Sequence, residues 1–198
     1  MRAPAEPAPH RIATTVVNSS KRKGDRAERE AVTVLRGLAP DLVVASPQRL
    51  LGAGRREDTG DLWVFPGVTV QVKCRADPLN ALRAAADGAT AQAARAGSRF
   101  AVGLIPLPRA RAHAVRWVAC CHHWPAPVPA GTSRFRSVAR ALTLIRARDP
   151  AVPRSHRLTV VDRAGSTPLF LAPVEAWVDA YRDAISVGAP SIPARPGR

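Results

Sequence analysis

The stretch DLWVFPGVTVQVKCR, residues 61–75, constrains the fold more than any other part of the chain. It contains two short apolar runs divided by a Pro-Gly dipeptide, which is typical of a tight turn. This pattern predicts strands over residues 61–65 and 68–75 with a hairpin between them. The alanine-rich segment 78–95 that follows predicts a helix. A strand pair followed directly by a helix indicates a mixed α/β fold.

The segments on either side of this stretch extend the same pattern. A helix capped by Ser19 or Ser20 is expected to run to about residue 38, because apolar side chains recur on one of its faces. That face carries Ala27, Ala31, Leu35 and Leu38. A short strand is expected within residues 41–50, and segments 98–107 and 112–121 predict two more. The sequence therefore predicts a central mixed β-sheet flanked by helices.

The chain is expected to form one core with an extension. Residues 19–125 hold the elements above, and residues 126–186 predict an α+β extension, helix-hairpin-helix-like in its order. Its elements are a basic helix over about 132–146, a hairpin turning at Ala164-Gly165 and an amphipathic helix over 174–185. We expect the extension to pack on the core, with an independent small domain as the alternative. Residues 1–18 and 187–198 are rich in proline and alanine and are expected to be disordered tails.

The charge balance favours an anionic partner. The formal net charge is +15 and the isoelectric point is near 11.6, so nucleic acid is the first candidate. No apolar run approaches the roughly 20 residues that a bilayer span needs, and the first residues lack the apolar core of a signal peptide. Three cysteines provide no disulfide framework. We therefore expect a cytoplasmic protein without a membrane partner.

One lysine stands out among the basic residues. The chain has 27 arginines and three lysines, yet Lys73 lies in the valine-rich strand. Strand alternation places Gln71 and Lys73 on one face and the valines on the other. Asp61 opens the preceding strand, and Glu28 lies at the edge of the apolar face of the first helix. Packing of these elements would gather two carboxylates, an amide oxygen and an ammonium group.

This set of groups suits metal-assisted chemistry. Carboxylate and amide oxygens are ligands for a hard cation such as Mg²⁺, which keeps several waters and needs few protein carboxylates. A lysine beside the cation can position or deprotonate an attacking water, whereas arginine does not give up its proton. This role would explain why Lys73, one of only three lysines, lies in the strand.

Three motifs in this order resemble a known family. Residues 23–30, KGDRAERE, place Glu28 on the first helix; a glycine-bearing loop precedes Asp61; and Gln71-Val72-Lys73 follows on the next strand. The pattern resembles the PD-(D/E)XK nuclease superfamily and, within it, the archaeal-type Holliday junction resolvases. The likeness covers roughly residues 20–120. It implies a restriction-endonuclease-like core over residues 19–125.

The resemblance also implies an activity. It points to an endodeoxyribonuclease that requires Mg²⁺, with Mn²⁺ as a substitute, and that cuts branched DNA such as four-way junctions. Glu28, Asp61, Gln71 and the backbone carbonyl of Val72 would bind the metal, and Lys73 would assist the water. A homodimer is implied because two strands must be cut symmetrically.

The chain departs from the family pattern at one ligand. Gln71 stands where the pattern prefers an acid, so one negative charge is lost, and Asp58 is a candidate substitute ligand. Two alternatives follow. One is a restriction-type or repair nuclease of the same fold, and the other is a catalytically inactive DNA-binding protein that retains the fold.

Basic residues near the expected site are candidates for DNA contact. Lys21 and Lys23 lie at the start of the first helix, where simple solvation explains them equally well. Arg55 and Arg56 flank the acidic loop and are better placed to hold a phosphate beside the metal. The arginines of the expected basic helix either widen the DNA footprint or form a solvated face.

The string CCHH, residues 120–123, has the residue types of a zinc site but not the spacing. Adjacent residues cannot all turn towards one ion, and the chain has no second pair at zinc-finger spacing. We expect these side chains to pack at the end of a strand.

Overall fold

The computed structural model describes residues 12–49, 61–75, 77–107, 115–147, 157–162 and 164–187; the side chains of residues 12–20, 48, 49 and 147 lie outside this description. The elements are α1 (Ile12–Leu38), η1 (Pro40–Leu42), β1 (Gln48–Arg49), β2 (Leu62–Trp63), β3 (Val68–Val72), α2 (Pro78–Ala96), β4 (Phe100–Pro106), β5 (Trp117–Cys121), β6 (Ser133–Phe135), α3 (Val138–Ala147), β7 (Thr159–Val161), β8 (Leu169–Pro173) and α4 (Val174–Ser186). None of the helices in these ranges is long and apolar enough to cross a bilayer.

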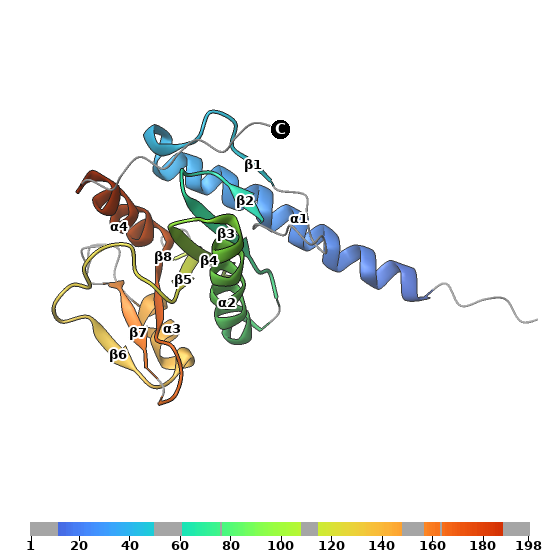
Figure 1. Cartoon of the computed structure of the whole chain (residues 1–198). Helices are drawn as coiled ribbons and strands as arrows, with labels where there is room; N and C mark the ends of the chain where they lie inside the picture. The colour runs from blue at the N-terminus through green and yellow to red at the C-terminus, as the bar shows by residue number, and fades with distance from the viewer. Residues whose placement is uncertain are drawn as a thin grey trace, which may run out of the picture.

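The strands form one mixed sheet of eight strands in the order β1-β2-β3-β4-β5-β8-β7-β6 (Figure 1). The β3–β4 and β6–β7 pairs are parallel, and the other pairs are antiparallel. The predicted α/β class with a central mixed sheet is therefore confirmed. The parallel β3–β4 pair requires a crossover, which α2 provides.

Helices cover both faces of the sheet. On one face α1 and α4 enclose a core with the valines of β3 and with Phe65, Trp177 and Tyr181. On the other face α2 and α3 enclose a second core with β4, β5, β7 and β8. The predicted apolar face of α1 is confirmed, since Ala27, Ala31 and Leu35 are buried there. The first half of α1 projects beyond the sheet (Figure 1).

The predicted hairpin is formed by β2 and β3, which pair antiparallel with Leu62 opposite Val70. Gly67 in the turn has a φ of 62°, a conformation that glycine adopts without strain. The hydroxyl of Tyr181, on α4, donates a hydrogen bond of 2.9 Å to the carbonyl oxygen of Pro66. A residue of the C-terminal extension thereby fixes the turn of the hairpin.

Helix α2 begins and ends where its sequence indicates. The side chain of Asp77 caps the first turn, and Gly97, at a φ of 65°, ends the helix. The alanines of α2 allow a very close approach to the sheet. A Cβ atom at Gly103 of β4 would lie 2.6 Å from the Cβ of Ala85, so only glycine fits there.

The N-terminal part differs from the prediction in two respects. The first helix begins at Ile12 rather than at a serine cap at 19 or 20, so residues 12–18 are helical and not part of a tail. Neither proline nor glycine interrupts the chain between Ile12 and Lys23, which lets the helix extend. The strand expected within 41–50 is reduced to β1, because Pro40 starts a 3-10 helix instead.

The extension contains one strand that was not predicted. Residues 133–135 form β6, parallel to β7, so α3 begins at Val138 and not near residue 132. The hairpin of β7 and β8, with Gly165 at positive φ in its turn, is confirmed, as is the helix α4. Because β8 pairs with β5, the extension continues the sheet of the core.

Candidate functional site

The carboxylate of Asp61 lies against the end of β3. The backbone N–H of Asp61 donates to the carbonyl of Val70 at 2.9 Å, which fixes the residue just before β2. Its Oδ2 accepts a hydrogen bond of 2.7 Å from the N–H of Val72 and a second one from the side-chain amide of Gln71. Asp61 and Gln71, ten positions apart in the sequence, are therefore brought into direct contact by the hairpin register.

The side chain of Gln71 is buried between the sheet and α2. It is 3% exposed, and its amide oxygen lies 3.2 Å from the position that a Cβ atom would take at Gly88. Glycine in the middle of a helix costs roughly 0.5–1 kcal/mol relative to alanine. Gly88 therefore weakens α2 locally and makes room for the amide that contacts Asp61.

Lys73 follows the last residue of β3 and remains part of its pairing with β4. Its backbone N–H donates to the carbonyl of Leu104 at 3.1 Å, and the side chain is half-buried. By alternation this side chain leaves the strand on the same face as that of Gln71. Within the described ranges Lys73 forms no ion pair.

The remaining predicted site residues lie farther out or outside the description. Glu28 is half-buried on α1, whose neighbouring Ala27 packs on the valine face of β3, so it approaches from the opposite side of the sheet from α2. Its meeting with Asp61 stays a prediction. Lys21 and Lys23 are exposed on α1. The predicted Arg55, Arg56 and Asp58 lie outside the described residues.

The contacting pair offers donors of the type that Mg²⁺ prefers. No group of three or more His, Cys, Asp or Glu side chains comes together within the described ranges, so these ranges contain no closed cage. The carboxylate of Asp61 and the amide of Gln71 instead fit a cation that keeps most of its waters. The amide nitrogen now faces Asp61, and a half-turn of the amide exchanges nitrogen for oxygen at the same place. The pair can therefore present two oxygens together when a cation is between them.

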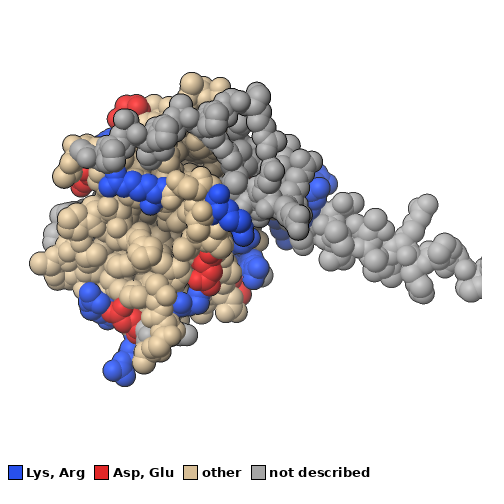
Figure 2. Space-filling view, viewed as in Figure 1, with Lys and Arg blue, Asp and Glu red and all other residues tan. Residues whose placement is uncertain are grey.

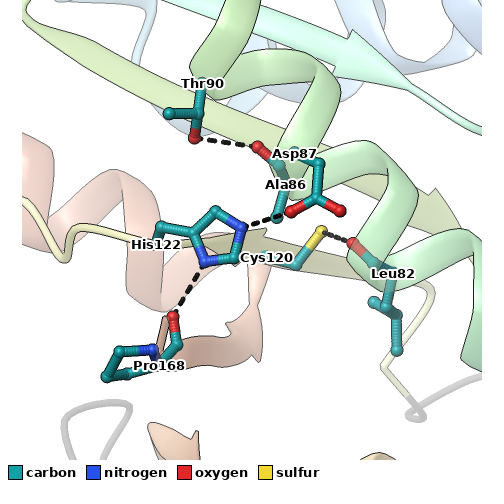
Figure 3. Close-up of polar contacts among 7 residues, drawn as sticks. All are labelled: Leu82, Ala86, Asp87, Thr90, Cys120, His122 and Pro168. Atoms are coloured by element: carbon teal, nitrogen blue, oxygen red, sulfur yellow. Dashed lines mark hydrogen bonds and ion pairs between the residues drawn. The ribbon is translucent and has the colours of Figure 1, made fainter. Parts of the chain in front are cut away.

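A second polar cluster, which sequence reasoning missed, lies between α2 and the end of β5 (Figure 3). His122 is 8% exposed; its Nδ1 lies 2.9 Å from the carbonyl oxygen of Pro168, and its Nε2 lies 2.6 Å from Oδ1 of Asp87. The thiol of Cys120 donates to the carbonyl of Leu82 at 3.1 Å. The only sequence signal was a histidine at the end of an apolar strand, and its partners are 35 and 46 positions away.

The geometry of the CCHH string differs from that of a metal site. Cys120 belongs to the core under α2 and Cys121 to the core under α1 and α4, so the two thiols point to opposite faces of the sheet. Burial raises the pKa of both thiols, which keeps them protonated near neutral pH, whereas a metal needs thiolates. His123 is exposed. These side chains serve packing at the strand end.

Comparisons with known proteins leave the family open. No protein-family model matches the chain, and no curated protein or solved structure matches it either. The function must therefore be argued from the contact between Asp61 and Gln71 and from the position of Lys73 beside it. These three residues define what we call the hairpin site.

Proposed function

We propose that the protein is a metal-dependent endonuclease that hydrolyses phosphodiester bonds in DNA at the hairpin site. The observation that carries this proposal is the direct contact of Asp61 with Gln71, with Lys73 two residues farther along the same strand face. A carboxylate, an amide and an ammonium group that pairs with no acid of the described residues are a suitable set for hydrolysis of an anionic substrate.

Each residue has a distinct task in this proposal. Asp61 would hold the cation by its carboxylate, and Gln71 would offer its amide oxygen as a second ligand. Bound Mg²⁺ would neutralise charge that builds up on the phosphate oxygens. Lys73 positions the water or takes one proton from it. The oxygen of that water forms a bond to phosphorus as the bond from phosphorus to one sugar oxygen breaks, and the displaced oxygen takes a proton from solvent.

The arrangement of elements supports a restriction-endonuclease-like core. The order helix, three strands, helix, strand places the hairpin that carries the site inside the mixed sheet, with helices on both faces. The resemblance noted in the sequence further supports Glu28 and the carbonyl of Val72 as ligands, branched DNA as substrate, Mn²⁺ as a substitute metal and a homodimer.

Charge and cysteine chemistry agree with a nucleic-acid partner in the cytoplasm. The net charge is +15, and Lys21 and Lys23 are exposed on α1, the helix that carries Glu28. All three cysteines are free, as expected in a reducing compartment.

A second candidate function is DNA binding without cleavage. The observation that favours it is the hydrogen bonding of Asp61, whose Oδ2 already accepts from both the Val72 amide and Gln71. Gln71, in the place where the family pattern has an acid, donates a hydrogen bond to the carboxylate of Asp61, so this carboxylate has a partner without a metal. In that case the hairpin would be a structural remnant of a nuclease site.

The test is cleavage of labelled four-way junctions and of linear duplex of equal length, at one stated salt concentration, with Mg²⁺ or Mn²⁺. We expect the wild-type protein to cut and the variants Asp61→Asn and Lys73→Ala to lose roughly 10²-fold or more in rate while DNA binding persists. Asp41→Asn is the matched control, because Asp41 is an exposed aspartate paired with Arg182 away from the site.

The outcomes separate the candidates. Cutting that depends on the metal and on both residues supports the enzyme, and preference for the junction supports a structure-specific one. Binding without cutting by the wild-type protein under either metal overturns the enzyme proposal and supports the second candidate. Equal loss in Asp41→Asn would show that the effect is not specific to the site.

A further inference from the structure

Two adjoining hollows lie where the start of α3 meets α2 and β6. The first, of about 460 Å³, is lined by Arg134, Phe135, Arg136, Ser137 and Arg140. The second, also of about 460 Å³, is lined by residues of the first half of α2, including Arg83, and by the first residues of α3. Ser137 lines both hollows, so they adjoin at this residue, and we call the two together the arginine groove.

The arginines of this groove come from three parts of the chain. Arg83 is on α2, Arg134 is on β6, Arg136 follows β6, and Arg140 is on α3. Figure 2 shows Lys and Arg side chains over the part of the molecule where Figure 1 draws β6, β7 and α2, with Asp and Glu side chains between them. Packing of distant segments, and not a run of basic residues in the sequence, concentrates the positive charge here.

Arg83 contains a donor that the described residues do not satisfy. Its Nη2 is buried and has no hydrogen-bond partner there. A buried unpaired guanidinium nitrogen is costly, since hydrogen bonds to charged groups contribute about 1.5–3 kcal/mol. Arg83 also lines the second hollow, so a rotation of its side chain would expose this donor to a ligand oxygen in the groove.

The acidic groups near the groove are already engaged. Asp162 binds Arg134 at 2.5 Å, and Asp87, in the second hollow, binds His122 at 2.6 Å. The first turn of α3 contains no acidic residue, so its backbone N–H groups add positive potential at Ser137. The four arginines of the groove outnumber these two carboxylates, which leaves a net positive charge along it.

We propose that the arginine groove binds consecutive phosphates of a DNA backbone. Arginine is suited to phosphate because its planar guanidinium donates two parallel hydrogen bonds. Helix α2 begins at Pro78, shortly after Lys73, so the same helix that buries Gln71 also forms one wall of the groove. DNA held in the groove would extend from the hairpin site across α2 towards α3. This inference rests on the proposed action on DNA for its partner.

The experiment measures duplex and junction binding by the full chain at several salt concentrations. The variant Arg83→Gln/Arg140→Gln removes one arginine from each hollow. The control Arg36→Gln/Arg182→Gln removes the same charge from α1 and α4, on the opposite face of the sheet. Thermal unfolding of the double variant shows whether the half-buried Arg83 is needed for folding. If the double variant does not fold, Arg140→Gln alone, at an exposed position, tests the groove.

We expect the groove variant to bind DNA roughly tenfold or more weakly at 0.1 M salt and to lower the salt slope by about 2, with Arg140→Gln lowering it by about 1. The control should change both values much less. Equal losses in groove and control variants would overturn the groove and leave DNA as the partner. So would unchanged binding by both Arg140→Gln and the double variant. Absence of DNA binding by the wild-type protein would overturn the groove and the proposed function together.

Discussion

Two polar contacts lie at neighbouring residues of α2, Asp87 and Gly88, and they differ in how completely their polar groups are satisfied. Asp87 binds His122, whose other ring nitrogen faces the Pro168 carbonyl, so both sides of the imidazole are occupied (Figure 3). The adjacent Gly88 contacts Gln71, which binds Asp61. Both ring nitrogens of His122 therefore have a protein partner.

The hairpin site is not closed in the same way. The amide oxygen of Gln71 faces the bare backbone of Gly88, and Lys73 next to it forms no ion pair with a described residue. Polar groups that are fully paired specify a structure, whereas groups with spare capacity can meet a ligand. We therefore expect His122 and Asp87 to serve stability, and we propose Asp61, Gln71 and Lys73 for the chemistry.

The largest effect on stability is expected from His122→Ala. The change removes a buried ring together with its contacts to the Pro168 carbonyl and the Asp87 carboxylate and leaves a cavity, so we expect a loss of about 2–4 kcal/mol in the free energy of unfolding. Urea unfolding measures it, with His123→Ala, at an exposed position, as a control that should stay within about 0.5 kcal/mol. Equal stability of the two variants would contradict the structural role of His122.

A double-mutant cycle tests the contact between Gly88 and Gln71. In the Gln71→Ala background, Gly88→Ala should stabilise the protein by roughly 0.5–1 kcal/mol, because alanine favours the helix. With Gln71 present the new Cβ lies 3.2 Å from the amide oxygen, so the gain should shrink or reverse, a coupling of about 1 kcal/mol.

Gly24→Ala is the matched control for this cycle. Gly24 is inside α1 and has nothing within 4 Å of the added Cβ. The same stabilisation of roughly 0.5–1 kcal/mol is expected with or without Gln71. If Gly88→Ala changes the stability by the same amount with and without Gln71, then Gly88 is not needed to make room for the amide of Gln71.

A smaller effect is expected at the turn that carries the hairpin site. Tyr181→Phe removes the hydrogen bond to Pro66 and should cost about 1 kcal/mol near neutral pH. Burial raises the pKa of Tyr181 from 10 to about 12, so the folded state holds this proton more tightly than the unfolded state. The contribution is fully present below pH 10 and is lost as pH rises towards 12.

The free energies of unfolding of Tyr181→Phe and wild-type protein between pH 8 and 12 measure this contribution. Both proteins contain the same cysteines, so the effect of cysteine ionisation cancels in the difference between the two free energies. The stability advantage of the wild-type protein should narrow above pH 10. A constant difference over the whole range would contradict the raised pKa.

The sequence predicted those parts that depend on local patterns. The Pro66-Gly67 turn, the alternation along β3 and the alanine-rich helix that begins at Pro78 are each readable within a few residues. The contact of Asp61 with Gln71 followed from the short hairpin between them. A short loop leaves few possible registers, which is why two of the site residues could be brought together in advance.

What the sequence did not predict depends on partners far along the chain. Residues 133–135 form a strand only because β7 lies beside them. The pairing of His122 with Asp87 and the arginine groove likewise join segments that packing alone brings together. In the sequence Gly88 only weakens a helix, and its contact with Gln71 of the neighbouring strand is visible only in the structure.

The central claim is that Asp61 and Gln71 hold a divalent cation, and calorimetric titration of Mg²⁺ into the purified protein tests it most directly. We predict binding by the wild-type protein, loss of binding in Asp61→Asn, and roughly tenfold tighter binding in Gln71→Glu, because a second carboxylate adds charge to the ligand set. Absence of Mg²⁺ binding in both the wild-type protein and Gln71→Glu would contradict the account.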